Sequence, residues 1–299
     1  MPDELRITEK PLLERPVLIA AFRGWNDGGQ GASLAGAFLA RQWEAEQFAD
    51  IDPEEFFDFQ VNRPTVHLDE GLQRRLEWPE NTLYHSRIPG TQRDVVLLLG
   101  QEPNMRWQRF ARLVVDLGVE LGVDLVISLG ALLADVPHTR PAPVTGSASD
   151  QALVEKLGLQ LSRYEGPTGI VGVLHDAFRN AGVPSVSLWA AVPHYVSLAP
   201  SPKAALALCN RLAQLLNVEI DTSELDEASE SYQQQVTEAV ATDEETAAYV
   251  EELEQRADTI ESFAEGGELP TGESLAAELT RFLREQEHRR KDDPPADQS

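Results

Sequence analysis

Three apolar segments that each run into a polar loop constrain the fold of this chain more than any other feature of its sequence. Leu125–Leu129 is apolar and partly β-branched with one serine, and Gly130 follows it. Pro16–Phe22 and Asp94–Gly100 have the same character. Such runs are typical of strands buried on both faces of a parallel sheet. The polar residues after them are therefore expected beyond the carboxyl ends of the strands, where open α/β sheets bind ligands.

Helical patterns lie between these strand candidates. Asp27 precedes a segment rich in small residues, for which its carboxylate is a suitable N-cap. Apolar residues recur at helical spacing over Asn104–Gly122 and lead into Leu125–Leu129, which predicts a βαβ unit with a right-handed crossover. Phe56–Val61 alternates and is a further strand candidate. The alternation of elements predicts one α/β domain over residues 16–218, with helices on both sides of a mainly parallel sheet.

The two ends of the chain differ from this central part. Residues 1–15 are expected to form an irregular lead. From Ser223 onward, apolar residues step by three or four without a strand signal, which predicts an acidic helical extension over residues 219–290. A second helix within it is expected over about Ser274–His288, and residues 291–299 are expected to be disordered. Amphipathic helices of this kind must cover either the α/β domain or a neighbouring subunit.

The charge of the chain bears on its partners. The formal net charge is −25, and residues 219–299 hold 24 of the 50 acidic residues but only 6 of the 25 basic ones. This balance disfavours nucleic acids and anionic membranes, which bind clustered Lys and Arg, and it favours basic partners. No run approaches the roughly 20 apolar residues of a membrane span, and no signal peptide is evident, so we expect a cytoplasmic protein. The single Cys209 is expected to be a small buried hydrophobe.

Two loops are candidate binding sites at strand ends. Asn26, Asp27 and Gly28 stand at the start of a predicted helix, whose free N–H groups can hold an anion. The alternative is that Asp27 caps the helix and the glycines allow close packing; no complete phosphate-binding glycine motif is present. His138 and Arg140 lie in a proline-rich loop that is suited to a carboxylate or phosphate group, or else to a subunit contact.

Further candidates come from three other strand ends or loops. Glu165 and Thr168 can place an acceptor and a hydroxyl over the same crevice, although Pro167 and its flanking glycines equally suit a tight turn. Glu102 and Glu165 are candidates for a pair of carboxylates in acid–base work. His194 stands among aromatic residues that are more typical of core or interface anchors. The histidines lack the spacing of metal ligands, so we expect neither a metal site nor a cofactor.

Four motifs together resemble the proteasome assembly chaperone 2 family, in particular its actinobacterial branch. They are GWNDGG from Gly24, GALLADVPHTRPAPVTG from Gly130, YEGPTG from Tyr164 and SLWAAVPHYV from Ser187. The resemblance implies a nucleoside-phosphorylase-like α/β domain, often a homotrimer, with added C-terminal helices. It implies no catalytic residues, since the eukaryotic members are non-enzymatic assembly chaperones. The final three residues, Asp-Gln-Ser, lack the hydrophobic-Tyr-X tail with which some archaeal relatives engage a proteasome ring.

Two functions of different classes follow. The first is an oligomeric, non-enzymatic protein of the assembly-chaperone type, which binds protein partners through its strand-end loops and acidic helices. The alternative is a small-molecule hydrolase or phosphorylase-like transferase that uses the crevice at the strand carboxyl ends. The only serine in the Leu125–Leu129 strand lacks the preceding glycine of a nucleophile elbow, and no catalytic triad can be assigned, which favours the first.

Overall fold

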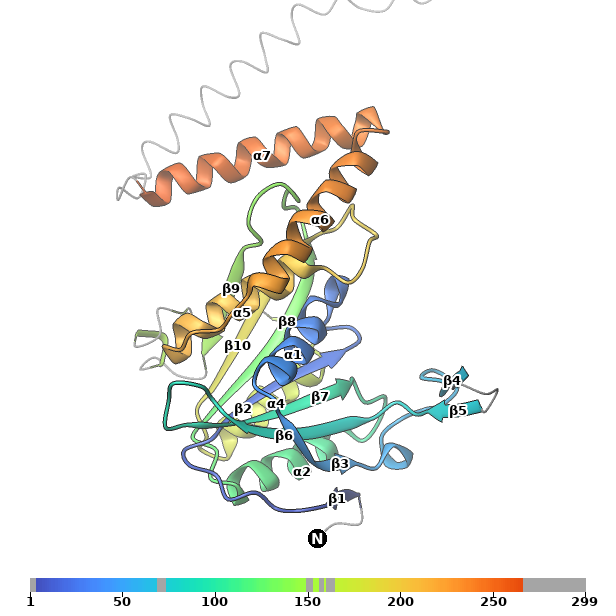
Figure 1. Ribbon diagram of the computed structural model, residues 1–299, viewed down its shortest axis with the longest axis vertical. Coiled ribbons are helices and arrows are strands. Elements are labelled where there is room, and N and C mark those ends of the chain that lie inside the picture. Colours follow the sequence, from blue (N-terminus) through green and yellow to red (C-terminus); the bar gives the residue numbers. More distant parts are fainter. Residues whose placement is uncertain (1–3, 69–73, 149–152, 156–158, 160–164, 266–299) are drawn as a thin grey trace, which may run out of the picture. The chain divides into compact units, whose positions relative to one another are not determined.

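An eight-stranded mixed sheet forms the centre of the protein in a computed structural model that describes residues 4–68, 74–148, 153–155, 159 and 165–265 (Figure 1). The strand order is β1-β3-β6-β7-β2-β8-β10-β9. A separate two-stranded sheet pairs β4 with β5. The strands are β1 (Leu5–Ile7), β2 (Val17–Arg23), β3 (Glu46–Ile51), β4 (Thr65–Leu68), β5 (Arg74–Glu77), β6 (Asn81–Arg87), β7 (Asp94–Gln101), β8 (Leu125–Ala134), β9 (Val144–Ala148) and β10 (Ser185–Pro193).

The middle of the sheet is parallel. Strands β7, β2, β8 and β10 run side by side in the same direction, so their carboxyl ends meet at one edge. Strands β6, β3 and β1 continue the sheet antiparallel on one side, and β9 does so on the other. The three apolar segments that predicted buried parallel strands are β2, β7 and β8, and the predicted α/β class is confirmed.

Helices cover both faces of this parallel centre. Helices α1 (Gly31–Gln42) and α5 (Pro202–Leu216) pack together on one face, and α2 (Trp107–Glu120) and α4 (Ile170–Asn180) pack on the other. Along β2, alternate side chains enter the two resulting cores: Ile19 joins the residues of α1 and α5, and Phe22 joins those of α2 and α4. Burial on both sides explains why these strands are continuously apolar. Cys209 of α5 is fully buried, which raises the pKa of its thiol to about 12.

Two helices follow the α/β domain, α6 (Ser223–Val240) and α7 (Glu244–Glu265). Helix α6 packs on α5 and buries Leu225, Tyr232 and Val236. One compact unit extends to Val250, so α6 lies in the same unit as the α/β domain; a second unit begins at Glu251 and contains the rest of α7. The helix predicted over Ser274–His288 and the tail at 291–299 lie outside the described residues.

Two predictions about local structure were wrong. Residues 1–15 were expected to be irregular, but Leu5–Ile7 form β1 at the edge of the sheet, a strand too short to show a period in the sequence. Phe56–Val61 was a strand candidate, yet this part of the chain follows a 3₁₀ turn, η2 (Pro53–Glu55), and is built of turns. Phe56 and Phe57 are buried from this turn, which accounts for the apolar pattern. No helix in the described part of the chain has the length and apolar character needed to cross a membrane.

Candidate functional site

Two clusters of polar side chains occupy the edge where the parallel strands end. The first, called here the Glu102 cluster, lies at the ends of β2 and β7 and consists of Trp25, Asn26, Glu102 and the first amide of α4. Glu102 Oε1 accepts hydrogen bonds from Asn26 Nδ2 at 2.9 Å and from the Ile170 amide at 2.8 Å. Its Oε2 accepts from the Trp25 amide at 3.2 Å. A carboxylate at the N-terminus of α4 is also favoured by the helix dipole.

Gly169 allows α4 to begin against this cluster. A Cβ atom at this position would stand 2.4 Å from Asn26 Nδ2 and 2.6 Å from Glu102 Oε1, distances that real side chains do not tolerate. The absence of a side chain therefore lets the Ile170 amide reach the carboxylate. The glycine in the predicted loop thus serves close packing. Glu165 and Thr168, which precede it, are exposed.

Asp27 holds the start of α1. Its Oδ1 accepts from the amides of Ala32 at 2.8 Å and Ser33 at 3.2 Å, across the short 3₁₀ turn η1 (Gly28–Gln30). The carboxylate therefore uses the donors that an anion would need, which agrees with the helix-capping alternative even though Gln30 is the residue next to α1. Burial raises the pKa of Asp27. Gly28 packs on β8, where an added Cβ would lie 3.1 Å from the Ala131 carbonyl oxygen.

The second cluster, called here the His138 cluster, lies at the ends of β8 and β10 and includes His138, Tyr195, Lys203, Gln233 and Thr237. His138 is 2% exposed. Its Nδ1 and its amide both lie 2.8 Å from Tyr195 Oη, and its Nε2 lies 3.0 Å from Thr237 Oγ1. The Thr237 hydroxyl donates to the Gln233 carbonyl oxygen, so it accepts from His138, which places a proton on Nε2. Lys203 donates to the His138 carbonyl oxygen and to Gln233 Oε1.

One residue of α7, Tyr249, extends this cluster. Tyr249 Oη donates to Asp135 Oδ1 at 3.1 Å, and His194 Nδ1 lies 3.2 Å from the same oxygen. The rings of His194, Tyr195 and Tyr249 meet edge to face. His194 is thus an aromatic anchor between strand and helix. The space left beside His138, Arg140 and Lys203 is about 10 Å³, too small for more than one water molecule.

The predicted site residues therefore do not converge on one open crevice. Asn26 and Glu102 are joined, whereas His138 and His194 belong to the contacts that hold α6 and the start of α7. Arg140 is half-buried and donates to Thr139 Oγ1 at 3.3 Å. Glu102 is held by three N–H groups and Glu165 is exposed, and no hydrogen bond between described residues supports the acid–base pair that was considered. No group of three or more potential metal ligands occurs among the described residues.

The half-buried Lys203 ammonium makes a pH-dependent contribution to stability. Burial, with a smaller effect of Arg140, lowers its pKa from 10.5 to about 8. Between these values unfolding takes up a proton, so the penalty of burying the charge is full below pH 8 and is relieved as the pH rises toward 10.5. We expect the unfolding free energy of the wild type, relative to Lys203→Met, to increase from pH 8 to pH 10. Urea titrations of both proteins at four pH values measure this, and a constant difference would contradict it.

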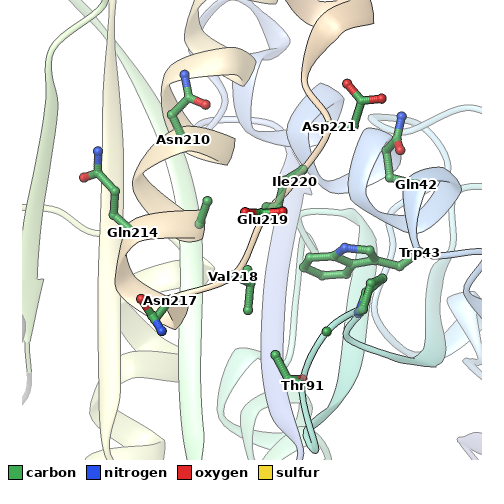
Figure 2. Close-up of a pocket in the computed structure, with 13 residues that line it drawn as sticks. Gln42, Trp43, Thr91, Asn210, Gln214, Asn217, Val218, Glu219, Ile220 and Asp221 are labelled. Atoms are coloured by element: carbon green, nitrogen blue, oxygen red, sulfur yellow. The ribbon is translucent and has the colours of Figure 1, made fainter.

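A larger cavity that the sequence did not predict lies away from the strand carboxyl ends (Figure 2). Its volume is about 1130 Å³. It is lined by the end of α1, the turn before β7, and the end of α5 with the segment that follows, which are residues 42–43, 89–91 and 210–221 in part. The three segments are far apart in the sequence and share no motif, since each is only the end of a helix or a turn before a strand. Their proximity comes from the packing of α1 on α5.

Comparisons with known proteins identify relatives over most of the chain. The family model described as PAC2 family matches residues 21–240. The crystal structure of a PAC2 family protein from Streptomyces avermitilis is 53% identical, covers 79% of this chain and 99% of that chain, and has a TM-score of 0.74. A Mycobacterium tuberculosis structure described as a proteasome-assembly chaperone homologue is 49% identical, with 78% and 99% covered and a TM-score of 0.72. A second M. tuberculosis protein, of unknown function, is 28% identical, with 88% and 93% covered and a TM-score of 0.79.

Proposed function

This chain belongs to the PAC2 family, and from that membership we propose that it is a non-enzymatic, proteasome-assembly-chaperone-like protein that binds protein partners and self-associates. The observation that carries the proposal is the 49% identity to the M. tuberculosis proteasome-assembly chaperone homologue, over 99% of that chain. A likeness of this extent includes both polar clusters and the helices around them, since the family model alone matches residues 21–240.

The engagement of the polar residues supports a binding role over catalysis. The Glu102 carboxylate already accepts three hydrogen bonds from N–H groups, so both of its oxygens are engaged in contacts that hold the loop after β2 and the start of α4. Both ring nitrogens of His138 have partners, and the space beside it is about 10 Å³. These groups therefore stabilise the strand-end loops. The rival proposal of a small-molecule enzyme at this crevice loses two of the residues on which it relied, Glu102 and His138, to these structural contacts.

Trp25 is the residue we propose as the centre of the partner surface. Its side chain is 66% exposed, which is unusual for a tryptophan, while its amide is fixed by Glu102. Tryptophans are frequent hot spots in protein interfaces. Glu165 and Thr168, also exposed at this edge, would form the polar rim.

The β4–β5 hairpin is the surface we propose for self-association. All of its described residues are exposed, and the pairing of Val66 with Leu76 places both on one face with Leu68. These three side chains are 52%, 53% and 67% exposed. An isolated two-stranded hairpin is marginally stable in water, so a second copy that covers its apolar face would stabilise both.

One set of measurements on four proteins tests the proposal. Size-exclusion chromatography with light scattering should give an oligomer for the wild type and for Trp25→Ala, and a smaller species for Leu76→Asp. Pull-downs from native lysate should retain proteasome subunits with the wild type and lose most of them with Trp25→Ala. Thr65→Asp adds the same charge to the opposite face of the hairpin and serves as the control for Leu76→Asp. A monomeric wild type that retains no partner would rule out the proposed function.

A further inference from the structure

The 1130 Å³ cavity is bounded by the carboxyl ends of two helices (Figure 2). Helix α1 ends at Gln42 and α5 ends at Leu216, and the residues that follow them, Trp43 and Asn217, both line the cavity. The last carbonyl groups of a helix lack intrahelical partners and carry the negative end of its dipole. Two such ends at one cavity produce a negative potential there before any side chain is considered.

The charged side chains that line the cavity are also negative. Glu219 and Asp221 contribute carboxylates, and hydrogen bonds from the Ser223 amide and hydroxyl lower the pKa of Asp221, which keeps it ionised. None of the 13 lining residues is Lys, Arg or His. Two arginines that do not line the cavity have partners of their own. Arg41 pairs with Glu224, and Arg211 Nη1 donates a 3.3 Å hydrogen bond to Oε1 of Gln214, a lining residue.

The remaining lining residues can recognise a peptide. Four side chains carry carboxamides, which both donate and accept hydrogen bonds as a peptide backbone requires. Trp43 is 5% exposed, and no hydrogen bond joins its indole N–H to another described residue. A carbonyl oxygen is the natural partner for that donor. The apolar part of the cavity lining can pack against the methylene groups of a long basic side chain. The carboxamides belong to Gln42, Asn210, Gln214 and Asn217, and the apolar side chains to Pro89, Ala213, Val218 and Ile220.

We propose that this cavity binds a basic peptide segment of another protein, with a Lys or Arg side chain directed at Glu219 and Asp221. A free organic polyamine could satisfy the carboxylates, but it has no carbonyl oxygen for Trp43 and no amide groups for the carboxamides. The cavity lies apart from Trp25 and from the β4–β5 hairpin in the chain and its lining includes neither, so this site is independent of the proposed function.

Binding of a fluorescein-labelled tetra-arginine amide to the full-length protein, followed by fluorescence anisotropy at two salt concentrations, tests the proposal. The Glu219→Gln/Asp221→Asn variant should bind about tenfold or more weakly, because two charge-assisted hydrogen bonds lose their charge. The matched control is Glu54→Gln/Glu238→Gln, which removes the same charge at exposed positions that do not line the cavity and should bind within about twofold of the wild type. Equal weakening by both variants would show non-specific attraction to an acidic protein and overturn the site.

The carboxamides separate a peptide from a simple cation. Asn210 is exposed, so Asn210→Ala should leave the fold intact, which circular dichroism can verify. This variant should weaken tetra-arginine several-fold and leave spermidine unchanged. Spermidine that binds as tightly as the peptide, with the same response to Asn210→Ala, would overturn the assignment to a peptide. The absence of any binding by the wild type would overturn the site itself.

Discussion

Glu102→Ala is expected to lower the free energy of unfolding by about 3 kcal/mol, because two buried donors and one exposed donor lose their acceptor together. The buried ones are Asn26 Nδ2 and the Ile170 amide, and the exposed one is the Trp25 amide. A buried N–H group without a partner retains the full cost of its lost hydration. Urea denaturation followed by circular dichroism measures the change.

Two further variants isolate the role of this carboxylate. Glu165→Ala removes the same side chain from an exposed position just before α4, and it should change stability by less than about 0.5 kcal/mol. Glu102→Gln keeps one oxygen that can accept from both Asn26 Nδ2 and the Ile170 amide, and it places its NH₂ group only against the exposed Trp25 amide, so it should recover most of the loss. Equal effects of Glu102→Ala and Glu165→Ala would mean that the hydrogen bonds of the Glu102 cluster do not stabilise the fold.

The elements that the sequence predicted well are those with both faces buried. Continuous apolar runs identified β2, β7 and β8 because α1 and α5 cover one side of the sheet and α2 and α4 cover the other. The strand predicted over Phe56–Val61 was wrong because its burial does not come from a sheet. Phe56 and Phe57 enter the core from a turn, and a turn can bury apolar residues without forming a strand ladder.

The sequence predicted where the residues of the candidate site lie along the chain, but not which of them contact one another. The sequence placed Asn26, Glu102 and His138 at strand ends, and all three lie there. Which loops meet depends on the strand order β7-β2-β8-β10, in which β2, early in the chain, separates β7 from β8. Glu102 therefore contacts the loop after β2, whereas His138 contacts the loop after β10. Thr237, which binds His138 from 99 residues away, carries no signal that would have linked the two.

The contacts of α6 explain why the end of β8 is closed. Besides Thr237, the helix supplies Gln233 to Lys203 and the Tyr232 hydroxyl to the Leu198 carbonyl oxygen. Three polar contacts therefore add to the burial of Leu225, Tyr232 and Val236. A helix with an acidic outer face is thus attached to the strand-end loops through specific hydrogen bonds. The sequence alone left open whether this helix covers the domain or a neighbouring subunit, and within this chain it covers α5 and the ends of β8 and β10.

His138→Ala should consequently lower the free energy of unfolding by about 3 kcal/mol and loosen α6. The substitution opens a cavity in a fully packed region and leaves the Tyr195 and Thr237 hydroxyls without this partner. Denaturant titration measures the global effect. Hydrogen exchange measures the local one, because the amides of α6 should lose protection more than those of α2, which packs on the opposite face of the sheet.

His194→Ala is the matched control on the same rim. The His194 side chain is 45% exposed, and its contact with Asp135 is an exposed pair of the kind that contributes about 0–1 kcal/mol. It touches Tyr249 of α7, whereas the Thr237 hydroxyl of α6 bonds to His138, so protection of α6 should remain close to that of the wild type. If both variants released α6 to the same extent, aromatic packing around Tyr249 and Tyr195, rather than the imidazole hydrogen bonds of His138, would hold the helix to the strand ends.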